Sequence, residues 1–456
     1  MHSCMFSEYA LEAVHAIHAE CDVRGTRILH RFVDEKSLSK VCSQINSRAE
    51  GSSVDNTIID SRKIEPLLTE LLVLCNRGEE YIKYVLVSMA DATAPNTLSP
   101  SLETSVRGGA LSSSLRELLS YYISLEEYYL EESVSKAIEI DEAVPGSLTS
   151  SMVDDSFYIL LSSGKRALST ARAPSAVAIL NQINTVLSTT YRTSLVHKLQ
   201  GTPARLAACA PSIENPQPSA EAASYAMAIN DVDLSSVYSS KLRNQLESVS
   251  NQIFSSPHDM DRIRLVLADL NKTAADVQKL ADQASEQLTT SLMSRLRPLL
   301  DAFVSSSYEL LGDDGIDESW STNLLIAFDT AFTWLQQVLS PNLFDKVMES
   351  STDKIVSRME AAVAQKQFTQ LGGLQLEKDV RSLIIGLADL TSKSMREKFS
   401  KLQQTATVLG VETALEASEL ISDSNVSWRL TSLDIRQALT QRVDFSQAEV
   451  AAVRLH

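Results

Sequence analysis

The sequence predicts an all-α protein, and two observations support this prediction. Glycine and proline are scarce, with 14 and 12 residues in a chain of 456, whereas strands joined by tight turns would need both at regular intervals. Hydrophobic residues make up 44% of the chain and recur at spacings of three and four, which is the period of an amphipathic helix rather than the alternation of a strand.

The first half of the chain contains long helical patterns that are separated by polar breaks. Apolar residues follow the helical period over four stretches, 7–32, 36–47, 58–90 and 115–141. The stretch 92–113 is rich in Ser, Thr, Pro and Gly, which predicts an exposed loop. The Pro-rich stretch 201–219 predicts a second exposed break.

The second half begins at 255–257, where Ser-Ser-Pro has the form of a helix start. Apolar residues then alternate spacings of four and three: Ile263, Leu267, Leu270, Ala274, Val277, Ala281, Ala284 and Leu288. Such a heptad seam predicts a long helix packed along another helix. Further helices are expected over 320–339, 343–367, 374–409 and 412–420. Gly372 and Gly373 precede the third of these, so we expect a sharp turn there, with closely approaching backbones and a new helix from Leu374.

The breaks divide the chain into three expected domains. Residues 1–91 form an N-terminal helical segment, residues 114–256 a middle helical bundle, and residues 257–456 a C-terminal helical bundle. The last of these ends in a closing tail, residues 425–456.

The closing tail predicts two short helices. Thr431 or Ser432 can cap the first, and Ser446 with Glu449 forms a capping-box pattern for a second that reaches Leu455. Two helices joined by a tight turn suit either the reading of DNA or the sealing of a larger bundle. The formal charge of −17 disfavours nucleic acid, because the field of the chain repels a phosphate backbone.

Cysteine usage and hydropathy restrict the compartment. The five cysteines are odd in number and lack CxxC spacing, so we expect no disulfide framework and a reducing compartment. The sequence contains no run of 18 apolar residues, so it predicts no membrane-spanning helix. The N-terminus lacks the basic start and apolar run of a signal peptide.

Two patterns in the first half resemble sites of chemistry. His15, His18 and Cys21 lie three apart on one helical face, and Cys4 and His30 could complete a zinc site, but ordinary helix-face residues are the favoured interpretation. A stretch at 163–165, Ser-Gly-Lys, looks like the end of a phosphate loop, but arginine follows where Ser or Thr is required.

Two acidic patterns also fail as metal sites. The stretch 312–319 resembles a calcium loop, but Leu310 occupies the position of the first ligand. A cluster of glutamates, Glu126, Glu127, Glu131 and Glu132, lacks Glu-x-x-His and is interpreted as a charged outer face. We therefore expect no catalytic residue, no metal and no cofactor, and a protein that is not an enzyme.

Several segments, in order, carry a family resemblance. They are LEEYYLEESVSKAIEID, TSSMVDDSFYILLSSGKRALST, SWSTNLLIAFDTAFTWLQQVLSPNLFDKV, FTQLGGLQLEKDVRSL, REKFSKLQQTATVLGVE and WRLTSLDIRQALTQRVDFSQAEVAAVRL. From about residue 115 to its end, the chain resembles the family of the fourth subunit of the conserved oligomeric Golgi (COG) tethering complex. Members of that family carry a long N-terminal coiled-coil region that this chain is expected to lack, and they usually have arginine at the position of Lys401.

The resemblance implies an elongated rod of stacked antiparallel helical bundles. It implies a non-catalytic subunit that tethers vesicles in intra-Golgi retrograde transport and supports Golgi organisation, peripherally at the cytosolic face of Golgi membranes. The implied partners are other COG subunits and SNARE or SNARE-regulating proteins, with no nucleic acid. A helical enzyme without a recognisable motif, or another helical scaffold, is the alternative.

The closing tail is expected to fold back onto the helix that contains REKFSKLQQTATVL. An apolar stripe would turn inward, formed by Trp428, Leu433, Leu439, Val443, Phe445, Val450 and Val453. Lys401 would approach Asp434, while Arg436 and Arg442 would face neighbouring acids. The residues expected to lock the tail or to meet partners are Arg396, Lys401, Trp428, Asp434, Arg436 and Arg442.

Overall fold

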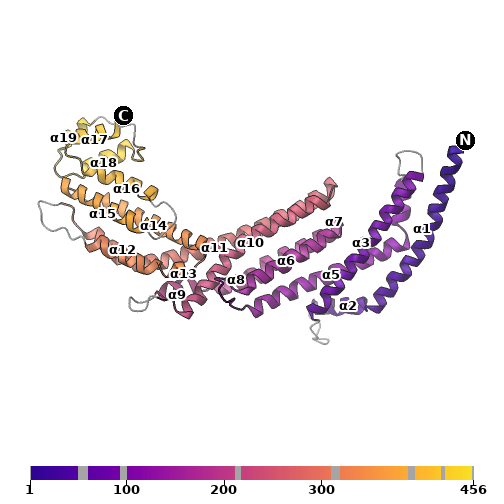
Figure 1. The fold of residues 1–456 in the computed structure, drawn as a ribbon. Helices are drawn as coiled ribbons and strands as arrows, with labels where there is room; N and C mark the ends of the chain where they lie inside the picture. Colours follow the sequence, from indigo (N-terminus) through magenta and orange to yellow (C-terminus); the bar gives the residue numbers. More distant parts are fainter. Residues whose placement is uncertain are drawn as a thin grey trace. The chain divides into compact units, whose positions relative to one another are not determined.

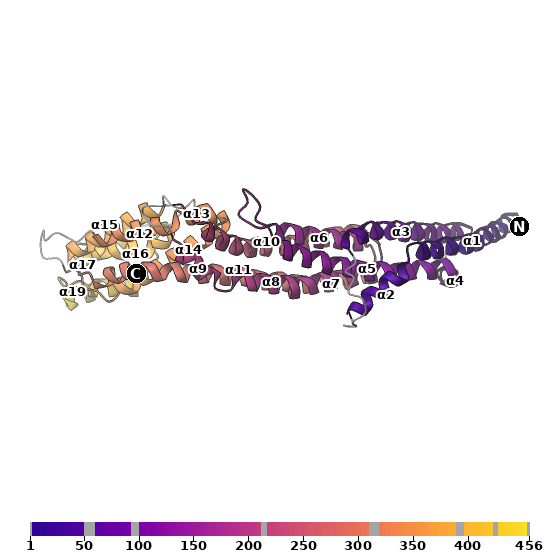
Figure 2. The ribbon, with the colours of Figure 1, turned by 90° about the horizontal axis from the view of Figure 1, so that it is seen from below.

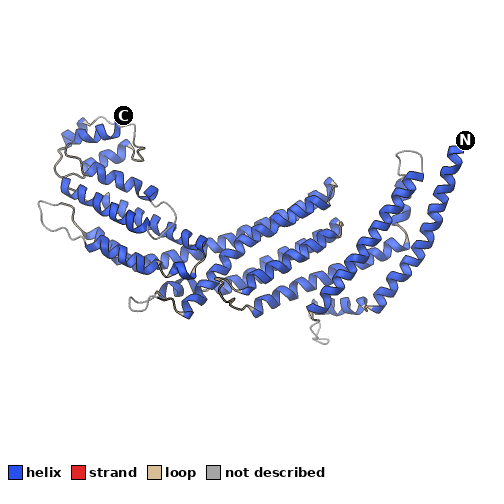
Figure 3. Ribbon diagram, viewed as in Figure 1, coloured by secondary structure: helices blue, strands red, loops and turns tan. Residues whose placement is uncertain are grey.

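A computed structural model describes residues 2–49, 60–92, 100–210, 217–309, 319–388, 396–422 and 427–453. Within these ranges the regular elements are helices, and only isolated β-bridges accompany them (Figure 3). The predicted all-α class is therefore confirmed. The chain forms two compact units, which are described separately below.

Unit 1 comprises residues 1–144, 150–196 and 234–278. Its helices are α1 (His2–Glu35), α2 (Leu38–Ala49), α3 (Ser61–Ala92), α4 (Pro100–Arg107), α5 (Ala110–Ile140), α6 (Ser151–Ser169) and α7 (Ala173–Val186), followed by the π-helical turn η1 (Leu187–Tyr191) and the start of α8 (Arg192–Leu199) (Figure 1). The end of α10 (Ala220–Ile253) and the start of α11 (Pro257–Ser305) complete it. Helix α5 is central, because it contacts α1, α2, α3, α6 and α7.

The segment expected as an exposed loop over 92–113 is partly helical, so that expectation is wrong within the described residues. Helix α4 spans Pro100–Arg107 and α5 begins at Ala110. Val106 of α4 is buried, and Asp22 of α1 accepts hydrogen bonds from the first backbone amides of α5, at 3.1 Å from Ala110 N and 2.9 Å from Leu111 N. A cap supplied from a distant helix was not visible in the local composition.

The glutamate cluster on α5 is only partly an outer face, so that interpretation is wrong for Glu126. This carboxylate is fully buried and receives two hydrogen bonds from Arg166 of α6, at 2.6 and 3.1 Å. Arg166 also lies over the Tyr129 ring, 5.1 Å from its centroid. Burial without this partner would be costly, so the pair ties α5 to α6 in one register.

Unit 2 comprises residues 145–149, 197–233 and 279–456. Its helices are α9 (Thr202–Ala208), α12 (Ser319–Phe332), α13 (Leu335–Val338), α14 (Pro341–Val363), α15 (Gln370–Ala388), α16 (Arg396–Leu409), α17 (Ala414–Ser422), α18 (Ser432–Thr440) and α19 (Gln447–Ala452), together with the end of α8, the start of α10 and the end of α11. Helix α16 packs against α14, α15 and α18, and α12 packs against α15. Figure 1 shows α15, α16 and α18 one beside another, and Figure 2 shows the same helices from below.

The heptad prediction for α11 is confirmed. All eight seam residues, from Ile263 to Leu288, are buried. In unit 1, Thr273 of α11 donates a hydrogen bond to Asn184 of α7 at 2.6 Å. In unit 2, Glu286 of α11 forms an ion pair with Lys354 of α14 at 2.6 Å. Side chains of α11 thus contact a neighbouring helix in each unit, and its heptad seam is buried.

The predicted turn at Gly372 and Gly373 is wrong, although the predicted close approach of backbones is present. Helix α15 begins at Gln370, after the Thr369 hydroxyl, which accepts a hydrogen bond from Gly372 N at 3.2 Å, and it continues through both glycines. A Cβ at Gly372 would overlap the carbonyl oxygen of Tyr308, and one at Gly373 would overlap that of Leu409. Glycine therefore serves packing here, inside a helix.

The two units group the chain differently from the three expected domains, since the divisions at 233/234 and 278/279 fall within α10 and α11. The domains 1–91, 114–256 and 257–456 remain a prediction. Among the described residues, no helix has both the length and the apolar composition needed to cross a bilayer.

Candidate functional site

Two capping boxes start the last helices of unit 2, and the one formed by Ser446 and Glu449 was expected. The Thr431 hydroxyl accepts a hydrogen bond from Asp434 N at 3.2 Å, and the Asp434 carboxylate accepts one from Thr431 N at 2.9 Å. Ser446 and Glu449 repeat this arrangement at 3.3 and 2.7 Å. Helix α19 ends at Ala452, and Leu455 lies outside the described residues. Of the two candidates for the first cap, Thr431 is the one that the structure has. Both caps could be sought in the local sequence, because each is made within four residues.

The tail packs on the bundle, but with a partly different apolar stripe. Leu439, Val450 and Val453 are buried as expected, and Trp428 and Phe445 are half-buried. The expectation is wrong for Leu433 and Val443, whose side chains are 76% and 50% exposed. The buried residues of α18 are Ile435, Ala438 and Leu439. Leu430, just before this helix, is also buried. Leu433 lies about 200° around the helix from Ile435, at 100° per residue, which places it outside.

Arg442 is the most deeply buried of the six residues expected to lock the tail or to meet partners. Its side chain is 1% exposed. Its Nη1 donates hydrogen bonds to the carbonyl oxygens of Leu409 and Val411, at 2.8 and 2.7 Å. Its Nη2 donates one to the Asp444 carboxylate at 2.9 Å. The guanidinium also lies 4.2 Å from the centroid of the Phe445 ring. Arg442 therefore joins the end of α16 to the segment that follows α18.

A short backbone ladder surrounds this arginine. Phe368 N donates to Gln441 O and Val443 N donates to Phe368 O, both at 3.0 Å. The Gln441 amide donates to Val363 O at 2.8 Å. Gln370 N, at the start of α15, donates to Asp444 at 3.2 Å. The ends of α14, α16 and α18 and the start of α15 thus share one polar junction. The buried Nε of Arg442 has no hydrogen-bond partner among the described residues.

A second contact joins α16 to α18. Lys401 Nζ lies 3.3 Å from Asp434 Oδ1, with side chains 46% and 30% exposed. The pair borders a hollow of about 250 Å³ that Glu360 of α14 also lines. Burial raises the pKa of the Glu360 carboxyl, while Lys401 opposes this rise. A pair this exposed contributes less than about 1 kcal/mol to stability, so it orients the two helices more than it holds them.

The remaining predicted residues lie at the surface or at its edge. Arg396 and Arg436 are exposed, and neither forms an ion pair within the described part of the chain, so the expected acidic neighbour of Arg436 is not found there. Trp428 is half-buried, and its indole N–H has no hydrogen-bond partner among the described residues. Arg429, which sequence reasoning did not select, donates to Glu397 O at 3.0 Å and ties the tail to the first turn of α16.

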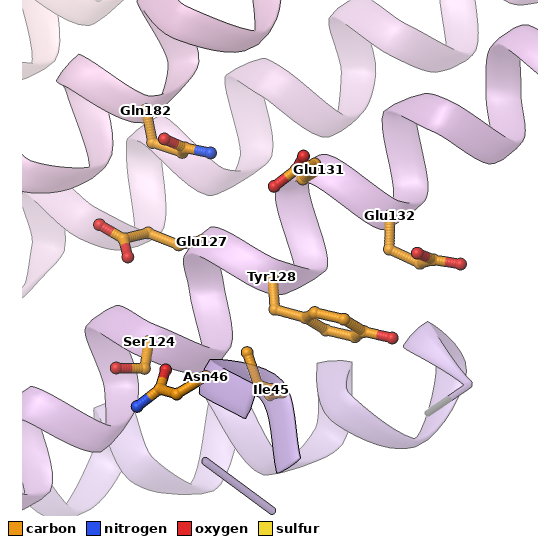
Figure 4. Close-up of a pocket in the computed structure, with 8 residues that line it drawn as sticks. All are labelled: Ile45, Asn46, Ser124, Glu127, Tyr128, Glu131, Glu132 and Gln182. Atoms are coloured by element: carbon orange, nitrogen blue, oxygen red, sulfur yellow. The ribbon is translucent and has the colours of Figure 1, made fainter. Parts of the chain in front are cut away.

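Unit 1 contains a polar hollow of about 330 Å³ (Figure 4). It is lined by Ile45 and Asn46 of α2, by Ser124, Glu127, Tyr128, Glu131 and Glu132 of α5, and by Gln182 of α7. Figure 4 shows Glu127 and Glu131 on the side of α5 toward Gln182, whereas Tyr128 and Glu132 point to the other side. Burial raises the pKa of the Glu127 carboxyl. The Glu132 carboxylate forms an ion pair with Lys136, with 3.8 Å between Oε1 and Nζ.

Two of the three histidines named in the zinc alternative have ordinary partners. His18 lies 3.2 Å from the Tyr81 hydroxyl and His30 lies 3.3 Å from the Ser114 hydroxyl. In the ranges that the structure describes, no group of three or more His, Cys, Asp or Glu side chains is placed to hold a metal ion. The side chain of Cys4 and the acidic stretch 312–318 lie outside those ranges.

Comparison with known proteins gives two family matches. Residues 2–199 match the model "COG4 transport protein, middle alpha-helical bundle", and residues 225–437 match "Conserved oligomeric Golgi complex subunit 4, C-terminal". Among solved structures, the C-terminal domain of the exocyst subunit Sec6p is similar, with a TM-score of 0.50 and 13% identity over 74% of this chain and 88% of that one. At this identity the likeness concerns the fold alone.

Curated relatives agree with the family models. Conserved oligomeric Golgi complex subunit 4 of Arabidopsis thaliana is 33% identical over 97% of this chain, and that of Bos taurus is 28% identical over 96%. The chain spans 61% of the length of each of these two relatives. Because the two family models together cover most of the sequence, the chain belongs to the family of conserved oligomeric Golgi complex subunit 4.

Proposed function

We propose that the chain is part of a non-catalytic subunit of a Golgi vesicle-tethering complex, which acts in intra-Golgi retrograde transport and Golgi organisation. The observation that carries this proposal is the match of both halves of the chain to the models of one subunit family. The fold is compatible with it, because the described residues form packed helices whose outer faces are available for contacts. The protein works by presenting those faces rather than by chemistry.

Its partners are the other subunits of the complex, together with SNARE or SNARE-regulating proteins, and it associates peripherally with the cytosolic face of Golgi membranes. The names of the relatives support the first part, since each is called a subunit of a Golgi complex. The acidic composition supports a protein partner over nucleic acid, because a charge of −17 opposes phosphate binding.

The C-terminal junction has a supporting role in this proposal. Arg442 and the pair Lys401 and Asp434 hold the tail on α16, and Trp428 packs at its start. A fixed tail presents the exposed arginines Arg396 and Arg436 in one arrangement to a partner. Preorganisation of this kind lowers the entropic cost of binding.

The test is affinity purification of the tagged protein from its own cell type, with mass-spectrometric identification of what is recovered. We expect other subunits of the conserved oligomeric Golgi complex, in amounts comparable with one another. A variant that carries Arg442→Ala should weaken the recovery by loosening unit 2. Recovery of no other subunit by the full-length protein would overturn the proposal.

A further inference from the structure

Helices α6 and α10 border a mainly apolar hollow of about 180 Å³ in unit 1. Each helix supplies four lining residues at spacings of three, one and three, from Asp154 to Leu161 on α6 and from Tyr238 to Gln245 on α10. Such spacings follow one face of a helix over two turns, a length of about 10 Å. The hollow therefore runs lengthwise between the two helices, and we call it the α6–α10 groove.

A small residue at one end and two rings at the other explain the groove. Beyond one end, Gly164 of α6 lets the helices approach closely, since a Cβ there would crowd the Leu246 side chain. At the other end, Phe157 meets the Tyr238 ring edge to face, with 5.6 Å between their centroids. The Tyr238 hydroxyl donates a hydrogen bond to Asp154 at 2.9 Å, which holds this ring in place. Packing within the chain thus forms the groove before any partner arrives.

The groove presents apolar surface of a size that suits one side chain. Phe157 is buried in its lining, whereas Tyr158 is 72% exposed beside it and Leu161 is half-buried. The volume is smaller than the roughly 300 Å³ at which pockets for small molecules begin. Hollows lined by aromatic residues are where the anchor side chains of protein partners are found. The groove therefore fits a large apolar side chain better than a metabolite.

One positive charge at the groove lacks a counter-charge. Lys241, in the lining contributed by α10, has its Nζ 5.6 Å from the centroid of the Tyr238 ring. A tyrosine ring carries no net charge, and Lys241 forms no ion pair within the residues that the structure describes. Asp154, the acid in the lining, is engaged by the Tyr238 hydroxyl instead. An acidic group from outside would therefore complete the charges of the groove.

We propose that the α6–α10 groove docks a helix of a partner protein, which inserts one leucine or phenylalanine beside Tyr158 and Tyr238 and places an acidic side chain on Lys241. A helix fits because the groove is two turns long and bordered by two helices, along which a third can lie. The acidic residue fixes the register of the partner, because a basic residue in its place would meet Lys241 with the same charge.

The test uses three synthetic helical peptides of about 18 residues, which is long enough for a helix to form. The first has a central phenylalanine with glutamate one turn before and one turn after it. The second has lysine in place of the glutamates, and the third has alanine in place of the phenylalanine. Fluorescence anisotropy with the whole chain should show binding of the first peptide and no measurable binding of the third. The second should bind about fivefold more weakly, which corresponds to about 1 kcal/mol.

Matched variants assign the binding to the groove. Tyr158→Ser should weaken binding of the first peptide about tenfold, and Gln245→Trp should do the same by filling the groove while leaving Lys241 in place. Lys241→Glu should reverse the preference between the first two peptides. Tyr84→Ser and Lys83→Glu on α3 are the controls and should change nothing, since Tyr84 is 71% exposed and Lys83 is also at the surface.

Equal binding of the glutamate and lysine peptides, or binding that the α6 and α10 variants leave unchanged, would overturn the inference. A dimer of the chain alone in sedimentation, dissociated by Tyr158→Ser, would also overturn it, because a second copy would then occupy the groove. The inference rests on the proposed scaffold function, which the recovery of complex subunits tests separately. Failure of the peptides with that recovery intact would remove the groove alone.

Discussion

Arg442 donates a hydrogen bond to the carbonyl oxygen of Leu409 at 2.8 Å, which joins the segment after α18 to the last residue of α16. The same nitrogen reaches Val411 O at 2.7 Å, so one buried side chain satisfies two carbonyls where α16 ends. Helix ends leave carbonyls without intrahelical partners, and an arginine from the tail is the partner here.

Truncation of Arg442 should destabilise unit 2. Arg442→Ala leaves two carbonyls and the carboxylate of Asp444 without this partner, and we expect a loss of about 3 kcal/mol in the free energy of unfolding. Urea denaturation followed by circular dichroism measures it. Arg436→Ala, at an exposed position of α18, is the matched control and should change stability by less than about 0.5 kcal/mol. Equal effects of both changes would show that Arg442 does not hold the tail.

The contact between Lys401 and Asp434 should show a small coupling. Each residue is reversed in charge alone, and both are then reversed together, and thermal midpoints are compared. We expect a coupling free energy below about 1 kcal/mol, because both side chains are partly exposed. Asp434→Lys alone should cost more than Lys401→Glu, since Asp434 also completes the cap of α18. A double reversal that recovers nothing would show that the two residues do not interact.

The cap of α18 should control the ionisation of Asp434. Hydrogen bonds from the Thr431 side chain and backbone hold the pKa of Asp434 below its ordinary value. The cap therefore stabilises the fold above the unfolded pKa of an aspartate and loses this contribution as pH falls through the lowered folded value. Thr431→Ala should raise the pKa of Asp434 toward its ordinary value in an NMR titration. Ser446→Ala, which alters the cap of α19, should leave Asp434 unchanged.

Glycine at 373 should be required although it lies inside a helix. Alanine is favoured over glycine by about 1 kcal/mol in a helix interior, so propensity alone predicts that Gly373→Ala stabilises the protein. We expect the reverse, a loss of about 2 kcal/mol or more, because the added Cβ would overlap the backbone of Leu409. Thermal unfolding measures the change. Gly386→Ala is the control with a smaller cost, since it meets only the movable side chain of Leu325, and equal costs would refute the packing argument.

The helical class, the α11 seam and both tail caps could be predicted because each depends on residues close together in sequence. The heptad spacing from Ile263 to Leu288 indicates which side of α11 is buried. The pair Ser446 and Glu449, three residues apart, indicates where α19 begins. The failures depend on distant partners. Glu126 is buried with Arg166, which lies 40 positions away in the sequence. Residue 373 is glycine inside a helix because the backbone of Leu409 packs on it. In the candidate site, the contact between Lys401 and Asp434 was predicted from the sequence, and the structure brings the two residues together. The role of Arg442 could not be predicted, because it depends on the position of the end of α16.

The most direct test of the account replaces the matched segment of the Arabidopsis thaliana relative with this chain, in cells that lack that relative. Recovery of the other complex subunits with the chimera is then quantified, and Golgi morphology is scored. The account predicts recovery at the level of the unaltered relative, and a reduced level for a chimera that carries Arg442→Ala. A folded chimera that recovers none of the other subunits would contradict the account.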